Sequence, residues 1–275
     1  MKIFRLAAFS NGISGGNPAG VVIAPTLPDD SAMQSLAAEI GYSETAFAAP
    51  GQKGWLVRYF SPETEVPFCG HATIALGAAL AMRHGDGRYA LSLRQGEISV
   101  EGRRQGSLWG AFLQSPSTRS RAEREDAVAA ALALFGLSPA DLDPSVPPTR
   151  ISAGADHLVF MLKRRETLAA MTYDFERGKA LMRQHGWVTL LLGHFETYQR
   201  IHCRNAFAYG GVYEDPATGA ATAALAGYLR ELGLPHEGRI EVYQGDDMGV
   251  PSRLHAEIGE EPGSSIRLSG TVRVL

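Results

Sequence analysis

The strongest constraint on this chain is a pattern that occurs twice. Residues 65–76 and residues 214–225, an offset of 149 positions, share Glu, Pro, Gly, Ala, Thr, Ala and Leu in the same register. A weaker match relates residues 16–22 to residues 154–160, in the same order along the chain. A solenoid needs at least three repeats. Two copies therefore predict two related half-molecules, and a cleft between such halves is a natural place for a small-molecule site.

Each repeat contains a helix of unusual composition. We expect helices over about residues 68–84 and 216–232, and charged residues are missing from 72–82 and from 216–229. A helix that is apolar on every side must be buried on every side. The segments around these helices have the pattern of short strands. The sequence therefore predicts an α+β fold of two pseudo-symmetric domains, each a strongly curved, barrel-like sheet around one central buried helix.

The boundary between the two domains is expected at a patch rich in proline and serine, residues 115–118. Such residues favour turns and connections between packed segments. The N-terminal domain then covers residues 1–115 and the C-terminal domain covers residues 116–275. The last strand, expected over residues 265–274, is free to return to the first domain.

Composition and charge exclude several classes of protein. The 275 residues are 45% hydrophobic and carry a formal net charge of -3, so the chain offers no basic surface for nucleic acid. Its longest uncharged run, residues 66–82, contains His71 and is short for a membrane span. Arg5 interrupts the apolar start of the chain, so we expect no signal peptide. With only two cysteines, Cys69 and Cys203, we expect no disulfide framework and a cytoplasmic location.

The beginnings of the two central helices are candidate anion sites. Pro67 and Pro216 suit a first helical turn, because their missing N–H would be unpaired there. Gly70 and Gly219 follow three residues later and leave backbone N–H groups uncovered at the positive end of the helix dipole, where carboxylates and phosphates bind. Asp215 is placed to cap the second helix. Two such helix starts facing one cleft would hold an anionic small molecule, although well-capped buried helices would produce the same pattern.

Five short motifs occur in order along the chain, and together they are far more specific than any one of them. They are Asn17-Pro18-Ala19-Gly20-Val21-Val22, Ser43-Glu44-Thr45-Ala46-Phe47, Cys69-Gly70-His71-Ala72-Thr73, Glu214-Asp215-Pro216-Ala217-Thr218-Gly219, and Gln244-Gly245 with Pro251-Ser252. In this combination the chain resembles the PhzF-like family of phenazine-biosynthesis isomerases, from about residue 3 to the C-terminus. The resemblance implies the architecture that this family shares with diaminopimelate epimerase and proline racemase. It also implies a cofactor-free, homodimeric enzyme that moves a proton on a small carboxylate-bearing metabolite.

The resemblance further implies roles for individual residues. Glu44 corresponds to the family's catalytic acid/base, and removal of a proton from carbon requires such a positioned base. His71 and Asp215 are expected to polarise the substrate and to assist proton transfer. The positions expected to bind the substrate are Asn17, Gly70, Gly219, Ala220 and Gln244. Ala220 departs from the family's pattern, which usually has Ser or Thr there, so a hydroxyl that would bind the substrate is missing.

Alternative functions follow from the same residues. A racemase or epimerase of the related two-thiol type is disfavoured, because the counterpart of Cys69 in the second repeat is Thr218, and Cys69 is then interpreted as a small core residue. A non-catalytic metabolite-binding protein on the same scaffold would explain Ala220. No metal site is expected, since Cys69 and His71 lack a second cluster at ligand spacing. No glycine-rich nucleotide loop occurs in the sequence, so no cofactor is expected.

Overall fold

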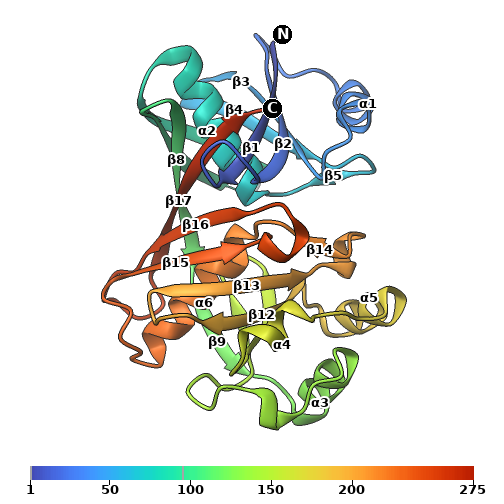
Figure 1. Cartoon of the computed structure of the whole chain (residues 1–275). Helices are drawn as coiled ribbons and strands as arrows, with labels where there is room; N and C mark the ends of the chain where they lie inside the picture. The colour runs from blue at the N-terminus through green and yellow to red at the C-terminus, as the bar shows by residue number, and fades with distance from the viewer. Residues whose placement is uncertain (1, 95) are drawn as a thin grey trace. The chain divides into compact units, whose positions relative to one another are not determined.

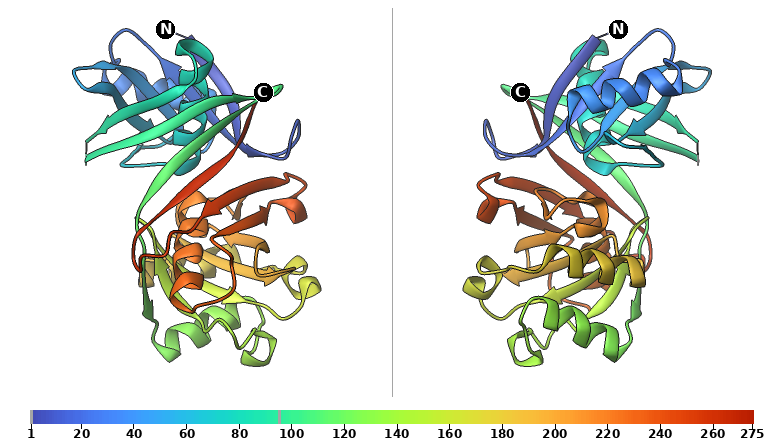
Figure 2. Two further views of the ribbon diagram at one scale, coloured as in Figure 1. Left: turned by 90° about the vertical axis from the view of Figure 1, so that its left-hand side faces the viewer. Right: turned by 90° about the vertical axis from the view of Figure 1, so that its right-hand side faces the viewer.

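The computed structural model describes residues 2–94 and 96–275 and divides into two compact units. The first unit extends to Gln114 and includes Ser269–Leu275, and the second is Ser115–Leu268. The chain passes between them within strand β8 (Leu108–Ser117) and returns within strand β17 (Ser265–Val274), and these two strands pair with each other (Figures 1 and 2). Residues 115–117 of the expected boundary patch therefore lie within a strand.

In the first unit, a curved sheet surrounds one buried helix. The elements in chain order are β1 (Lys2–Ser10), β2 (Asn17–Ile23), α1 (Asp30–Ile40), β3 (Thr45–Gly51), β4 (Gly54–Phe60), β5 (Glu65–Val66), α2 (Gly70–His84), β6 (Gly87–Leu93), β7 (Gly96–Gln105) and β8. Strand β1 pairs antiparallel with β2 and with the end of β17, while β2 is parallel to β3. The sheet then continues through β4 and β6 to the antiparallel pairs β6–β7 and β7–β8.

Helix α2 is the central helix of this unit, and its residues are buried from His71 to Ala81. Small residues let a strand pack directly on its backbone. A Cβ atom added at Gly77 would lie 2.5 Å from Cγ2 of Val100, and one added at Gly102 would lie 2.1 Å from the carbonyl oxygen of Gly77. The predicted buried helix is confirmed, although it begins at Gly70 and not at residue 68.

Helix α1 covers the opposite face of the same strands. Its side chains at Met33, Ala37 and Ile40 pack in one cluster with side chains of β2, β3 and β4, among them Phe47. Successive residues of a strand point to opposite faces of a sheet. The strands therefore present one set of residues to α1 and the alternate set to α2. Because both sets are buried, the sequences of these strands are almost continuously apolar.

The second unit repeats this arrangement with additional outer helices. Its elements are β9 (Arg119–Ala122), α3 (Glu125–Leu134), β10 (Thr149–Ser152), β11 (Asp156–Met161), α4 (Arg165–Ala169), α5 (Phe175–His185), β12 (Thr189–Phe195), β13 (Arg200–Ala206), β14 (Glu214–Asp215), α6 (Gly219–Glu231), β15 (Arg239–Gln244), β16 (Ser252–Glu257) and the start of β17, with 3₁₀ helices at Pro139–Asp141, Ala208–Gly210 and Asp246–Met248. Helix α6 is the central helix and is buried from Ala221 to Leu229. The fully buried Trp187 belongs to the cluster under α3 and α5.

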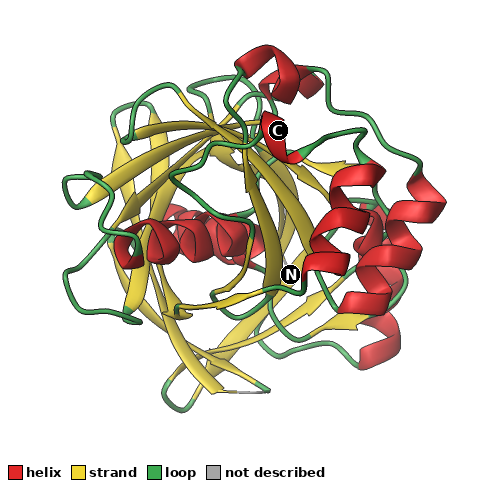
Figure 3. Ribbon diagram, turned by 90° about the horizontal axis from the view of Figure 1, so that it is seen from below, coloured by secondary structure: helices red, strands yellow, loops and turns green. Residues whose placement is uncertain are grey.

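The pairing of strands shows that the repeat in the sequence is also a repeat in the structure. Following the paired residues across each sheet gives Gly20, Thr45, Phe60 and Glu65 in the first unit and Leu158, Leu190, Ala206 and Glu214 in the second. The two ends of these paths match the two repeats that the sequence showed. The predicted fold class, two related halves with a curved sheet around a central helix, is confirmed, and the curvature of the strands is visible in Figure 3.

In each unit, an arginine–glutamate pair holds the short strand that precedes the central helix. Arg58 donates to both carboxylate oxygens of Glu65 at 2.7 Å. At the equivalent place Arg204 donates to Glu214 at 2.9 and 2.6 Å. The second pair is the more buried, with side chains 9% and 3% exposed against 12% and 26% for the first. Among the residues described, no helix is long and apolar enough to cross a membrane.

Candidate active site

Glu44 is positioned by the turn that joins α1 to β3. Gly41 ends α1 in the left-handed conformation, with φ of 74°, and its N–H donates to the carbonyl of Ala37. The N–H of Gly20, on β2, donates to the carbonyl of Glu44 at 3.2 Å. The backbone of Glu44 is therefore fixed to the sheet, while 17% of its side chain remains exposed.

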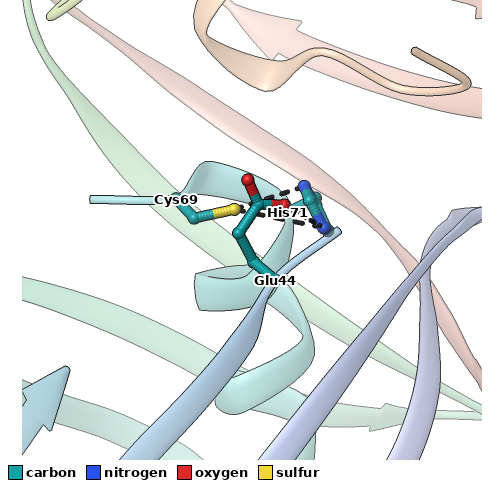
Figure 4. Close-up of side chains that lie close together, drawn as sticks. All are labelled: Glu44, Cys69 and His71. Carbon is teal, nitrogen blue, oxygen red and sulfur yellow. Dashed lines mark hydrogen bonds and ion pairs between the residues drawn. The ribbon is translucent and has the colours of Figure 1, made fainter. Parts of the chain in front are cut away.

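The structure brings the carboxylate of Glu44 to the imidazole of His71, the second residue of α2. Oε2 of Glu44 lies 3.5 Å from Nε2 of His71 (Figure 4). The hydroxyl of Ser43 lies 3.4 Å from the same nitrogen. The His71 side chain is only 8% exposed, so the pair joins a partly buried carboxylate to a buried imidazole.

Cys69 also reaches this place, which the sequence did not predict. Its Sγ lies 3.3 Å from Nδ1 and 4.0 Å from Nε2 of His71. Cys69 is the N-cap residue of α2 and is buried, as a core residue would be, but it contacts the predicted catalytic pair. The sequence did show Cys69 and His71 two residues apart at a helix start. It did not show that Glu44, from a distant segment, lies against both.

Gly70 leaves open space at the start of α2. A Cβ atom added there would meet no protein atom within 4 Å, so the fold itself does not require a glycine at this position. The N–H groups of a first helical turn have no partner within the helix. Thr73 holds this turn in place, since its hydroxyl donates to the carbonyl of Cys69 at 2.7 Å and also contacts the hydroxyl of Tyr59 at 2.6 Å. A rigid helix start beside unfilled space can hold a carboxylate.

Asp215 does not cap the second central helix. Helix α6 begins at Gly219, and Thr218 is its N-cap residue. Asp215 lies earlier, on β14, and its Oδ2 accepts a hydrogen bond from the hydroxyl of Thr218 at 2.6 Å. The prediction of an aspartate cap is wrong, because Pro216 and Ala217 extend the chain before the helix begins.

Gln244 reaches the start of α6, but both ends of its amide are engaged by the chain. Its Nε2 donates to the carbonyl of Asp215 at 2.6 Å and to the hydroxyl of Thr218 at 3.0 Å. Its Oε1 accepts from the N–H of Thr218 at 3.2 Å. Gln244 is fully buried, so we infer that its amide supports the backbone at the start of α6 from inside the protein. Asn17, also predicted to bind substrate, is buried at the first residue of β2, where it pairs with Ala8.

The structural repeat shows that the Glu44–His71 pair occurs in one half only. Glu44 precedes Thr45, and the equivalent position before Leu190 is Thr189. By the sequence repeat, Ala220 stands where the first half has His71, and Thr218 where it has Cys69. The second half therefore carries no carboxylate, imidazole or thiol at the three positions.

The second half has a buried polar network where the first has its carboxylate. Thr189 donates to Oδ1 of Asn205 at 2.9 Å and lies 2.8 Å from Nδ1 of His157. Burial lowers the pKa of His157 to about 4, so this imidazole is neutral at physiological pH. The sequence analysis missed these residues. The weaker repeat aligns His157 with Ala19, so a polar residue in an apolar strand was the signal that could have identified them.

Comparisons with known proteins agree over nearly the whole chain. The family described as PhzC-PhzF, phenazine biosynthesis-like protein, matches residues 6–274. The uncharacterized isomerase YfhB of Bacillus subtilis is 28% identical, over 98% of this chain and 95% of its own. An uncharacterized isomerase of Deinococcus radiodurans is 32% identical, over 92% of this chain and 85% of its own. The crystal structure of the Bacillus anthracis phenazine biosynthesis protein of the PhzF family shares the fold, with a TM-score of 0.85 at 22% identity over 100% of this chain and 98% of that one.

Proposed function

The chain belongs to the phenazine biosynthesis-like (PhzC-PhzF) family, and from this premise we propose that it is a cofactor-independent isomerase that moves a proton on a small carboxylate-bearing metabolite. The general class, isomerase, follows from the family and from the names of its curated relatives. The proton shift, the kind of substrate and the role of Glu44 are the proposed part. They are supported by the site in the first unit.

The observation that carries the proposal is the contact of Glu44 with His71, 3.5 Å apart at a helix start with open space beside it. In the proposed reaction, the Glu44 carboxylate takes a proton from carbon, and the electron pair passes into an adjacent unsaturated or carboxyl-bearing system. The same carboxyl group then returns the proton to another carbon on the same face. His71 donates a hydrogen bond to the developing charge, and the first N–H groups of α2 hold the substrate carboxylate.

A single acid/base group distinguishes this chemistry from racemisation by two bases. Racemisation of that kind needs a second proton-transferring group on the opposite face of the carbon. Thr189 and Ala220 occupy the equivalent positions of the second half, and neither is a base. Asp215 keeps its role in proton transfer as a proposal from family resemblance, which Asp215→Asn tests.

The test is proton NMR in D₂O with trans-2,3-dihydro-3-hydroxyanthranilate, the phenazine precursor, as the probe. We expect solvent deuterium at the new position, and a rate at least about 100-fold lower in Glu44→Gln, since a positioned acid/base contributes 10²–10⁴-fold. Glu39→Gln is the matched control, because Glu39 is an exposed carboxylate on α1. A Glu44→Gln variant with full activity would refute the proposed role.

A protein that binds a metabolite without changing it is the second candidate, and Ala220 is the observation that favours it. Its methyl group offers no hydrogen bond at the start of α6. Binding alone predicts a ligand-induced rise in thermal stability that persists in Glu44→Gln, with no deuterium uptake by the ligand. A panel of small carboxylates screened in the same way separates a different substrate from the absence of chemistry.

Two expectations from the family complete the proposal. We propose that the enzyme works as a homodimer, which sedimentation velocity tests directly. Cofactor independence predicts that activity survives exhaustive dialysis against a metal chelator. Loss of activity after dialysis, restored by adding back a small molecule or an ion, would contradict this part of the proposal.

A further inference from the structure

Three side chains of different chemistry converge at the start of α2. Glu44 comes from the turn before β3, whereas Cys69 and His71 come from the helix itself (Figure 4). One carboxylate oxygen, one sulfur and one ring nitrogen all lie within 4.8 Å of one another. Over residues 2–94 and 96–275, this is the one group of three or more such side chains that could hold a metal ion. The sequence argued against a metal because it showed only two donors, and the third is supplied by tertiary structure.

The distances are close to those between neighbouring ligands in a metal coordination sphere. Zinc bonds of about 2.0–2.3 Å at tetrahedral angles put an oxygen and a nitrogen ligand about 3.4 Å apart, and a sulfur and a nitrogen ligand about 3.6 Å apart. The observed separations from Nε2 of His71 are 3.5 Å to the Glu44 oxygen and 4.0 Å to the Cys69 sulfur. The Glu44 oxygen and the Cys69 sulfur lie within 4.8 Å of each other, against about 3.6 Å for a tetrahedral oxygen–sulfur pair. Binding would therefore require movements of up to about 1 Å, within the freedom of side-chain torsions.

We propose that Glu44, Cys69 and His71 form a binding site for a thiophilic divalent cation, with Zn²⁺ as the type, and that the bound ion switches the enzyme off. Carboxylate, thiolate and imidazole are the ligands that zinc takes in proteins. Binding displaces the thiol proton of Cys69 to solvent, while Glu44 and a neutral His71 each supply a lone pair. Three protein ligands leave the fourth position to water.

The switch rests on the proposed function of Glu44, whereas the binding of the ion does not. A carboxylate bound to zinc has its lone pair in the metal bond and cannot take a proton from carbon. Inhibition should therefore be released by a chelator, in keeping with the proposed cofactor-free reaction.

The chain offers a matched control for the sulfur ligand. Cys203 is the only other cysteine and lies in the second unit on β13, 3% exposed. Burial raises the pKa of its thiol to about 12, so it has little tendency to form the thiolate that a metal needs. Cys203→Ser should therefore leave metal binding unchanged, whereas Cys69→Ser removes one of the three donors. Neither substitution alters Glu44 or His71.

Titration with Co²⁺ under reducing conditions tests the site without reference to catalysis. A thiolate bound to Co²⁺ produces a charge-transfer absorption in the near ultraviolet, and tetrahedral Co²⁺ absorbs strongly in the visible. We expect both for the unaltered chain and for Cys203→Ser, saturating at one ion per chain. The near-ultraviolet band should disappear in Cys69→Ser.

Competition with a chromophoric chelator then measures the affinity for Zn²⁺. Loss of an outer-shell partner typically lowers metal affinity by about 10- to 100-fold. Loss of a ligand should lower it by more, so we expect over about 100-fold weaker binding in Cys69→Ser and His71→Ala. Whatever activity Cys69→Ser retains should resist Zn²⁺ concentrations that inhibit the unaltered enzyme.

The outcomes separate the two proposals. No near-ultraviolet band in the unaltered chain, or an equal band in Cys69→Ser, overturns the metal site. Full activity with one Zn²⁺ bound per chain overturns the switch. A band that depends on Cys69 supports the site even if Glu44→Gln proves fully active, and in that case the proposed acid/base role of Glu44 and the switch that rests on it fail, while the metal site stands.

Discussion

Adding a methyl group to Gly70 should remove function without harming the fold. Gly70 is the first residue of α2, and a Cβ atom there would meet no protein atom within 4 Å. It has no positive φ that would strain an alanine. If the space above Gly70 is reserved for the substrate carboxylate, a methyl group in that space blocks binding while the helix forms as before.

The magnitudes follow from the surroundings of two glycines in the same helix. Gly70→Ala should leave the free energy of unfolding unchanged or raise it by about 0.4–1 kcal/mol, because alanine restricts the unfolded chain. In Gly77→Ala the new Cβ would lie 2.5 Å from Cγ2 of Val100, and overpacking of this kind lowers the free energy of unfolding by about 1–3 kcal/mol. For Gly70→Ala we expect kcat/KM to fall on the order of 100-fold, which is comparable to the loss when one oxyanion-hole donor is prevented from reaching the substrate.

Urea unfolding and steady-state kinetics together provide the assay. Gly70→Ala should show an unfolding midpoint equal to or slightly above that of the unaltered protein, with a low kcat/KM. Gly77→Ala should show a lower midpoint, with near-normal activity per folded molecule. The reasoning is refuted if Gly70→Ala is as active as the unaltered enzyme on an identified substrate, since the open space would then hold nothing that matters for the reaction.

Three further predictions concern stability. Glu214→Gln should lower the free energy of unfolding by about 3–5 kcal/mol, because it leaves the buried charge of Arg204 without its partner, and urea midpoints measure this loss. Glu65→Gln should lower it by only about 1 kcal/mol, because the equivalent pair with Arg58 is more exposed, and equal losses in the two variants would contradict the argument from burial. His157 should make stability fall as pH drops from 6.5 to about 4, since the unfolded chain binds a proton that the folded chain excludes. The loss should approach about 3 kcal/mol, and His157→Gln should flatten this part of the pH profile.

The fold was predictable because the composition of its two central helices shows that both are buried. A helix without charge over three turns can only be buried, and finding it twice predicts two similar halves. The boundaries were less accurate. Helices were expected to begin at about residues 68 and 216, whereas they begin at Gly70 and Gly219, with the non-helical residues Cys69 and Thr218 as their N-caps. The patch at 115–118 was expected to be a domain boundary, and its first residues lie in β8, which pairs with the distant strand β17.

The candidate site was likewise predictable where it depends on local motifs and not where it depends on contacts between distant segments. The sequence by itself determined the candidates Glu44 and His71, the family, and the asymmetry between Cys69 and Thr218, because these depend on motifs and on the alignment of one repeat with the other. Only the tertiary structure decided that Cys69 touches His71 beside Glu44, that Gln244 is engaged by the loop before α6, and that Thr189 replaces Glu44 in the second half. The physical reason is that a motif specifies the local backbone, whereas a contact between elements depends on how strands far apart in sequence pair and how closely a helix packs on them.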